Sequence, residues 1–338
     1  MAVTILSRRE PSRGLSRFDP SRDLRQVAEL ISDTFGANLD SEGRRALRDM
    51  QRLSRVGPLV GMIMTSSPQL QALMGGYVWR DAGRVVGNLT LQSSMRYGGR
   101  WLISNVAVAP DYRRRGIGRE LMEAALNEIA QRGGGWAVLQ AEEGSEAARR
   151  LYGGLGLEAL GATAYLTLPE LPAALSPPEA ASGLRPWRST DGDREYELAR
   201  AATPSLLQWW QPVRSGAFHL HLEDRIAEQF DLLIGRRRTY RWVVVGEETS
   251  SQGRLSASLK VRATHWRGVH EVRLMVHPDA RGSLEETLVR QATSVLASYH
   301  NWPTAVRHPV DHHEAIAAFR AHGFQVQRTL VTMRKRIR

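Results

Sequence analysis

Three consecutive arginines and two glycines, in the order Arg113-Arg114-Arg115-Gly116-Ile117-Gly118, stand between an apolar run and a helical pattern. At the start of a helix the backbone N–H groups lack intrahelical partners, and the helix dipole adds partial positive charge. Glycines let the backbone approach a ligand closely, and guanidinium groups add charge-assisted hydrogen bonds. The segment therefore predicts an anion site suited to phosphate.

Two common phosphate-binding loops do not match this segment. No Gly-Lys-Ser/Thr follows the glycines, which excludes a P-loop, and position 121 is Leu where a dinucleotide-binding fingerprint has glycine. A Gly-x-Gly pair alone is weak evidence, because glycines occur in loops of every kind. The elements on either side of the loop must therefore decide what it binds.

The loop needs a strand before it and a helix after it, and the sequence predicts both. Residues 101–108 are strand-like, and apolar residues recur at helical spacing after Gly118. Further strands are expected near residues 15–18, 77–80, 84–92, 136–141 and 162–168, and helices near 23–35, 41–54 and 146–155. The pattern indicates a mixed α/β fold.

The composition is that of a globular protein. The chain has 338 residues, enough for two domains, with 42% hydrophobic and 24% charged residues. It has no cysteine, which excludes disulfides, thiolate metal sites and a cysteine nucleophile. The longest apolar stretch, residues 58–64, is too short to cross a bilayer, so we expect a cytoplasmic protein without membrane association. The net charge of +11 is spread over both halves, so nucleic acid is not an expected partner.

The two halves of the chain resemble each other. The segment Arg84-Val-Val-Gly-Asn-Leu-Thr-Leu91 is echoed by Arg254-Leu-Ser-Ala-Ser-Leu-Lys-Val261, and Val108-Ala-Pro-Asp111 by Val276-His-Pro-Asp279. Such spacing indicates a duplicated domain. We therefore predict a first domain over residues 1–168, a proline- and alanine-rich linker over 169–182 and a second domain over 183–338.

The segment from Val106 to Leu121 resembles the acetyl-CoA motif of the GNAT superfamily of N-acetyltransferases, in which Arg/Gln-x-x-Gly-x-Gly/Ala cradles the pyrophosphate. The later segment Glu146–Leu157 is similar to that family's helix whose tyrosine lies beside the CoA sulfur. The resemblance implies two tandem GNAT-like domains of the α/β (α+β) class, each with a mixed, mostly antiparallel sheet flanked by helices.

The resemblance also implies roles for particular residues. Backbone groups of the strand end would hold the pantetheine arm, and the Val106 N–H would polarise the thioester carbonyl. Tyr152 would protonate the departing thiolate, and Ser145 stands where the family often has Asn, which weakens or replaces one pantetheine contact. The implied acetyl-CoA-binding set is Val106, Ala107, Val108, Arg113, Arg114, Arg115, Gly116, Ile117, Gly118, Arg119 and Ser145.

The base that deprotonates the acceptor amine is less evident. All ten histidines lie beyond residue 218, so the first half has none. Glu142 and Glu143, just after a predicted strand, are candidates for the catalytic base, and a chain of water molecules is an equal alternative.

The second half keeps the apolar frame but departs from the motif. Leu284 and Glu285 or Glu286 replace the two glycines, and Phe319 stands at the position of Tyr152. Carboxylates there would repel phosphate, so we expect a degenerate GNAT-like domain. The histidines at 308, 312 and 313 suggest a metal, but adjacent histidines diverge on most backbones, and no metal site is expected.

Three classes of function fit these observations. The leading one is acetyl-CoA-dependent N-acetyl transfer to a small-molecule or peptide amine, by direct attack in a ternary complex because there is no cysteine to carry the acyl group. The alternatives are a tandem-GNAT aminoacyl transferase that uses charged tRNA and a non-catalytic acyl-CoA-binding module. The sequence leaves the acceptor and the choice between monomer and homodimer open.

Overall fold

The computed structural model describes residues 13–36, 41–55, 75–94, 99–171, 183–219, 237–246, 253–266 and 268–338. Most of the predicted linker lies outside these ranges. The chain divides into two compact units, the first made of Met1–Ala141, Ser145–Ala159 and Met333–Arg338 and the second of Glu142–Gly144 and Leu160–Thr332. None of the described helices is long and apolar enough to cross a membrane.

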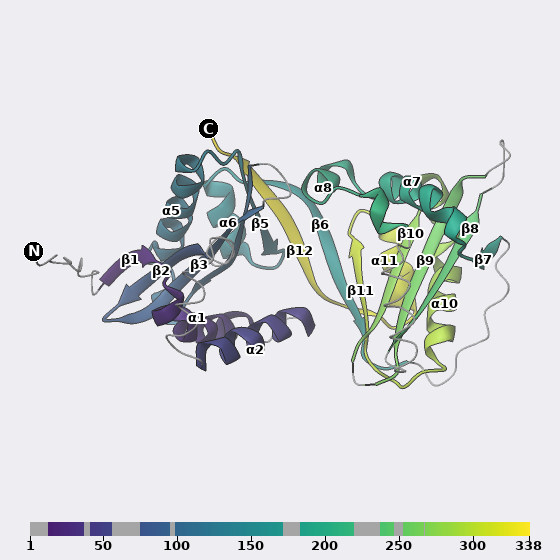
Figure 1. Cartoon of the computed structure of the whole chain (residues 1–338), viewed down its shortest axis with the longest axis horizontal. Helices are drawn as coiled ribbons and strands as arrows, with labels where there is room; N and C mark the ends of the chain where they lie inside the picture. The colour runs from purple at the N-terminus through teal and green to yellow at the C-terminus, as the bar shows by residue number, and fades with distance from the viewer. Residues whose placement is uncertain are drawn as a thin grey trace, which may run out of the picture. The chain divides into compact units, whose positions relative to one another are not determined.

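The first unit contains a mixed sheet in the order β1-β2-β3-β4-β5-β12 (Figure 1). Strands β1 to β4 pair antiparallel, whereas β4 and β5 run parallel. The elements are β1 (Arg13–Arg17), α1 (Pro20–Phe35), α2 (Ser41–Arg55), β2 (Gly75–Asp81), β3 (Arg84–Ser94), β4 (Arg100–Val108), α5 (Ile117–Gln131), β5 (Trp136–Glu142), α6 (Glu146–Gly154) and the end of β12 (Gln325–Arg336).

Helices cover both faces of this sheet because successive strand residues point to opposite sides. Helix α1 packs its apolar face on Val78, Val85 and Ala107. Helix α5 packs on the other face, where Gly87 of β3 allows it a close approach. A Cβ atom at Gly87 would lie 2.9 Å from Ile117 Cγ2, closer than the packing of a side chain permits.

The second unit repeats this plan, with the strand order β12-β6-β11-β10-β9-β8-β7. Helices α10 and α11 enclose the main core on one face, and α7 packs on the other through Leu198. The elements are β6 (Glu158–Leu168), β7 (Leu184–Pro186), α7 (Gly192–Ala202), α8 (Ser205–Trp210), β8 (Arg237–Val245), β9 (Leu255–Thr264), β10 (His270–Val276), α10 (Glu285–Leu296), β11 (Thr304–Pro309), α11 (His313–Ala321) and most of β12. The predicted mixed, mostly antiparallel sheet flanked by helices is confirmed.

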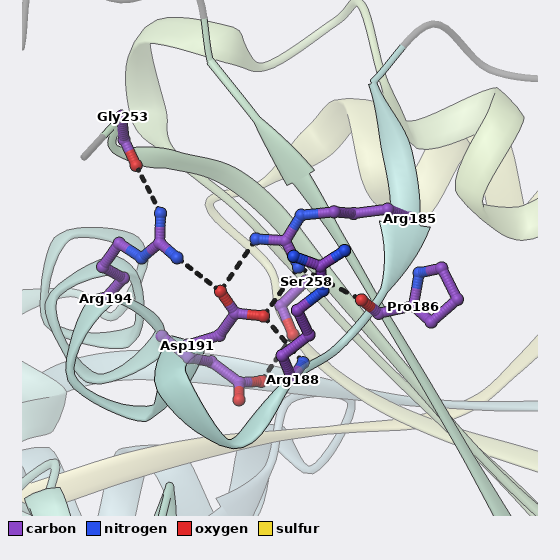
Figure 2. A network of polar contacts seen from close by, with 8 residues as sticks. Arg185, Pro186, Arg188, Asp191, Arg194, Gly253 and Ser258 are labelled. Carbon is purple, nitrogen blue, oxygen red and sulfur yellow. Dashed lines mark hydrogen bonds and ion pairs between the residues drawn. The ribbon is translucent and has the colours of Figure 1, made fainter. Parts of the chain in front are cut away.

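A buried aspartate anchors the first long helix of each unit. Asp191, before α7, accepts hydrogen bonds from Arg185 of β7 at 2.7 Å and 2.8 Å, from Arg194 at 2.7 Å and from the Arg188 N–H at 2.7 Å (Figure 2). These bonds lower the pKa of Asp191, so the carboxylate stays ionised although it is buried. In the first unit, Asp23 of α1 binds the buried Arg80 through two bonds of 2.8 Å.

The last residues of the chain belong to the first unit. Lys335 Nζ donates to the Leu155 carbonyl at 2.6 Å, and the Ile337 N–H donates to the Gly135 carbonyl at 2.9 Å. Arg334 also binds Glu158 at 2.7 Å. The first unit therefore takes a strand end from the opposite end of the sequence.

Candidate active site

Strand β4 carries a bulge near its end. Strand β3 pairs Asn88 with Ala107 but Thr90 with Ser104, so β4 has one residue more than β3 over this stretch. Asn105 lies in the left-handed region at φ 52°, a conformation that asparagine tolerates better than most residues. A bulge of this kind interrupts the ladder and redirects backbone groups.

Strands β4 and β5 are paired over only part of their length. The parallel register runs from Arg100 opposite Trp136 to Ile103 opposite Leu139, while β4 continues to Val108 and β5 to Glu142. The backbone of residues 104–108 therefore has no ladder partner on β5 and can bind a ligand there. The predicted pantetheine contacts, Val106 and Val108, lie in this stretch, whereas the Ala107 side chain is buried against α1.

The predicted anion loop leads from β4 into α5. Arg114 and Gly116 both have positive φ, at 62° and 84°, and Gly116 is the N-cap of the helix. Within the described residues, the N–H groups of residues 114–118 donate to no backbone carbonyl; the next two, of Arg119 and Glu120, bond to Gly116 O. Consecutive free N–H groups at a helix N-terminus form an anion-binding nest.

The arginines of the loop have different surroundings. Arg113 Nε donates to the Val108 carbonyl at 3.1 Å, and Arg115 donates to the Asp111 carbonyl at 2.7 Å while stacking on Tyr112. These two side chains therefore help to shape the loop. Arg114 is exposed and makes no hydrogen bond or ion pair within the described residues, which leaves it available to an anion.

Helix α6 packs against the start of α5. A Cβ atom at Gly118 would lie 3.3 Å from Leu151 Cδ2, a tight contact that the leucine side chain would have to relieve by a small shift. Tyr152 follows Leu151, and its ring is buried. Burial raises the pKa of Tyr152 to about 12, which keeps the phenol protonated at neutral pH. Ser145 is the N-cap of α6 but makes no side-chain capping bond.

The remaining predicted residues lie at the end of β5, just after it, or in the second half of the chain. Glu142 and Glu143 belong with the second unit, where the Glu143 N–H donates to Thr329 O, and they stay candidates for the base. His312 is buried and the adjacent His313 exposed, so the two diverge as expected. The described residues contain no group of three potential ligands that could hold a metal.

The geometry of a bulged, partly unpaired β4 that leads into a glycine-capped helix agrees with a family match. Residues 27–157 match the model of the acetyltransferase (GNAT) family. These residues form a GNAT acetyltransferase domain. GNAT acetyltransferases use acetyl-CoA as co-substrate and act on amines, so the prediction of an acyltransferase is confirmed at this level.

Relatives extend the similarity beyond the GNAT domain. The chain is 29% identical over 264 residues to mycothiol acetyltransferase of Mycobacterium sp. (strain JLS), covering 70% of this chain and 84% of the relative. An N-acetyltransferase structure from Sphaerobacter thermophilus covers 96% of both chains, at a TM-score of 0.61 and 18% identity. The match to a tandem GNAT protein from the clavulanic acid biosynthesis pathway covers 96% of this chain and 99% of that protein, at a TM-score of 0.51 and 19% identity. The tandem GNAT fold is therefore shared.

Two residues that shape the site lie on β3, outside the sequence motif of residues 106–121. Gly87 of β3 admits α5 to the sheet, and Asn88 contacts the bulge on β4. The only signal in the sequence was their place in the repeated segment, where Ala257 and Ser258 stand in the second half.

Proposed function

We propose that the chain transfers the acetyl group of acetyl-CoA to an amine by direct attack in a ternary complex. The observation that carries the proposal lies within the first unit. The stretch of β4 that has no partner on β5 leads to the free N–H groups at the start of α5. The stretch suits the amide-bearing arm of CoA, and the nest suits its pyrophosphate. The two elements follow one another along the chain, so one extended ligand can contact both.

Residues 113–119 would bind the pyrophosphate through the nest and the arginine side chains. Ile117 is buried in the core, so it contributes its N–H group alone. In the reaction the amine nitrogen forms a bond to the acetyl carbon, and the carbon–sulfur bond breaks. The Val106 N–H stabilises the oxyanion, Tyr152 donates a proton to the departing sulfur, and Glu142, Glu143 or water accepts the proton from the amine.

We assign catalysis to the first half of the chain. In the second unit, a carboxylate of the protein itself binds the N–H groups at the corresponding helix start. Glu285, at the start of α10, accepts the N–H groups of Gly282 at 2.9 Å and Leu284 at 3.1 Å. Burial opposes ionisation, but hydrogen bonds from His312 and from these N–H groups lower the pKa of Glu285. Its carboxylate therefore takes the donors that a phosphate would need.

A chain of hydrogen bonds extends from Glu285 to two histidines of the second unit. His312 Nε2 donates to Glu285 at 2.7 Å, because a carboxylate can only accept, and a second hydrogen bond of 2.8 Å joins His312 Nδ1 and His308 Nε2. His308 and Phe319, at the positions of Ala141 and Tyr152, are both buried. This supports the prediction that the second unit does not perform CoA chemistry.

For the acceptor, we propose a small-molecule amine of the kind used by mycothiol acetyltransferases. The support is the 29% identity to such an enzyme over 70% of the chain, which reaches beyond the GNAT domain.

Calorimetry with acetyl-CoA and the full chain tests the binding site. We expect one equivalent per chain, and we expect Gly118→Glu to weaken binding by about 100-fold or more, because it places a carboxylate and a crowded Cβ at the nest. The matched control is Gly153→Ala, since a Cβ there meets nothing within 4 Å. Two equivalents, or full binding by Gly118→Glu, would contradict the assignment.

Release of the CoA thiol in the presence of different acceptors tests the reaction. We expect release with the acceptor of mycothiol acetyltransferases or with a related amine. Binding of acetyl-CoA without release for any amine would indicate a binding module. Transfer from charged tRNA, without use of acetyl-CoA, would indicate an aminoacyl transferase.

A further inference from the structure

Asn88 is a buried amide in an apolar part of the first unit. It is 2% exposed and pairs across the sheet with Val78 on one side and Ala107 on the other. A buried amide costs free energy unless it forms hydrogen bonds. Asn88 Nδ2 donates to the carbonyl oxygen of Asn105 at 3.0 Å. The side chain thus holds one particular carbonyl, in the bulge of β4.

That carbonyl shares a peptide group with the N–H of Val106. A trans peptide is planar, and its C=O and N–H bonds point in opposite directions. When Asn88 holds the carbonyl of Asn105, the Val106 N–H must point away from Asn88. The pairing of β4 with β5 ends at Ile103, so this N–H has no ladder acceptor on β5.

A second hydrogen bond holds the same bulge without touching this peptide. Asn105 Nδ2 donates to Thr90 Oγ1 at 3.2 Å. The bond fixes the Asn105 side chain, whereas Asn88 fixes the Asn105 carbonyl. The two contacts can therefore be removed separately.

The second unit provides an internal comparison. Ser258 stands at the position of Asn88, and it donates to Glu195 of α7 at 2.5 Å instead of to a neighbouring strand. Strands β9 and β10 pair in unbroken register from Arg262 opposite Glu271 to Ala257 opposite Val276, without a bulge. The bulge and the asparagine thus occur together in the unit with the open nest, and both are absent where Glu285 fills the nest.

We infer that Asn88 is a positioning residue for acetyl transfer. It fixes the orientation of the Asn105–Val106 peptide and so aims the Val106 N–H at the thioester carbonyl of bound acetyl-CoA. The inference rests on the proposed function, in which this N–H is the oxyanion donor. Preorganisation matters because a donor contributes most when it does not have to reorient during the reaction.

The test uses the full chain and acetyl-CoA labelled with ¹³C at the acetyl carbonyl. A hydrogen bond to this carbonyl lowers its infrared stretching frequency. We expect a lowered frequency in the wild type and loss of most of this shift in Asn88→Leu, which has a similar shape but no donor. Acetyl-CoA affinity should stay within about threefold, while kcat falls about 10- to 100-fold, less than for complete removal of a donor.

Two further variants complete the test. Thr90→Val removes the other bond of the bulge and should keep most of the frequency shift. Asn88→Ser, the residue type of the second unit, replaces Asn88→Leu if that variant does not fold, and it should lose the shift because its hydroxyl is too short to reach the carbonyl. An unchanged shift and kcat in folded Asn88 variants would overturn the inference. A wild type without any shift would instead contradict the role proposed for Val106.

Discussion

Tyr152 and Phe319 occupy corresponding positions in the two units and differ by one hydroxyl group. Both rings are buried, so packing alone would accept phenylalanine at either position. The hydroxyl of Tyr152 makes no hydrogen bond within the described residues, and burial raises its pKa to about 12. A protonated phenol without a structural partner suits a group that donates a proton when a thiolate forms beside it.

We expect Tyr152→Phe to lower kcat by about 100-fold at saturating substrates, because a positioned general acid is lost. Acetyl-CoA affinity should change little, since the ring remains. Steady-state kinetics and calorimetry measure the two effects, with Tyr196→Phe in α7 of the second unit as the control. An unchanged kcat would make Tyr152 a packing residue.

At the scale of elements, buried polar groups fix how strands and helices meet. Asn88 joins β3 to the bulge of β4, and Asp191 joins β7 to α7. The chain of Glu285, His312 and His308 links α10, the start of α11 and β11. Such networks stabilise a fold only in the protonation state that completes their hydrogen bonds.

The histidine network predicts sensitivity to acid. Burial, with the nearby charges of His312 and Arg281, lowers the pKa of His308 to about 3. An unfolded histidine titrates near pH 6.5, so between about pH 6.5 and 3 the unfolded state binds a proton that the folded state does not. The free energy of unfolding should therefore fall as pH falls, by about 1.4 kcal/mol per pH unit from this group.

Urea unfolding of the second unit between pH 7 and 4 measures this slope. His308→Gln has no titrating group at this position. The slope of the free energy of unfolding against pH should therefore correspond to about one proton fewer taken up on unfolding than in the wild type. Equal slopes for the two proteins would show that His308 does not control the acid sensitivity.

At the scale of the whole molecule, the first unit is built from segments far apart in the sequence. The first unit includes Met333–Arg338, and the second begins its own strands with Leu160. A cut between the halves near residue 170 would therefore remove part of the first unit. The first unit, which holds the GNAT domain matched over residues 27–157, also includes the last six residues of the chain.

Deletion of residues 333–338 should destabilise the first unit. It removes the Lys335–Leu155 and Ile337–Gly135 bonds, together with the burial of Met333. We expect lower amide-exchange protection in β5 and weaker acetyl-CoA binding. Deletion of Arg338 alone, which is exposed, is the control. Unchanged protection in β5 would show that the first unit folds without this strand.

The sequence by itself was enough to predict what depends on local order. The loop of residues 113–118 follows a strand and opens a helix as expected, the helix at residues 41–55 begins where expected, and the duplication is visible in paired segments. These features follow from residues adjacent in the chain or repeated at helical spacing. The roles of the loop arginines, Tyr152 and the two candidate bases stay predictions, because they concern ligands.

Only the tertiary structure could show which distant residues meet. The bulge at Asn105 is a matter of register between β3 and β4, and no local pattern marks the extra residue. The histidines of the second half read as metal ligands or loop residues, whereas the fold places His308 and His312 in line with Glu285. Such pairings depend on strand register and long-range packing. Both are set by contacts between residues that lie far apart in the sequence.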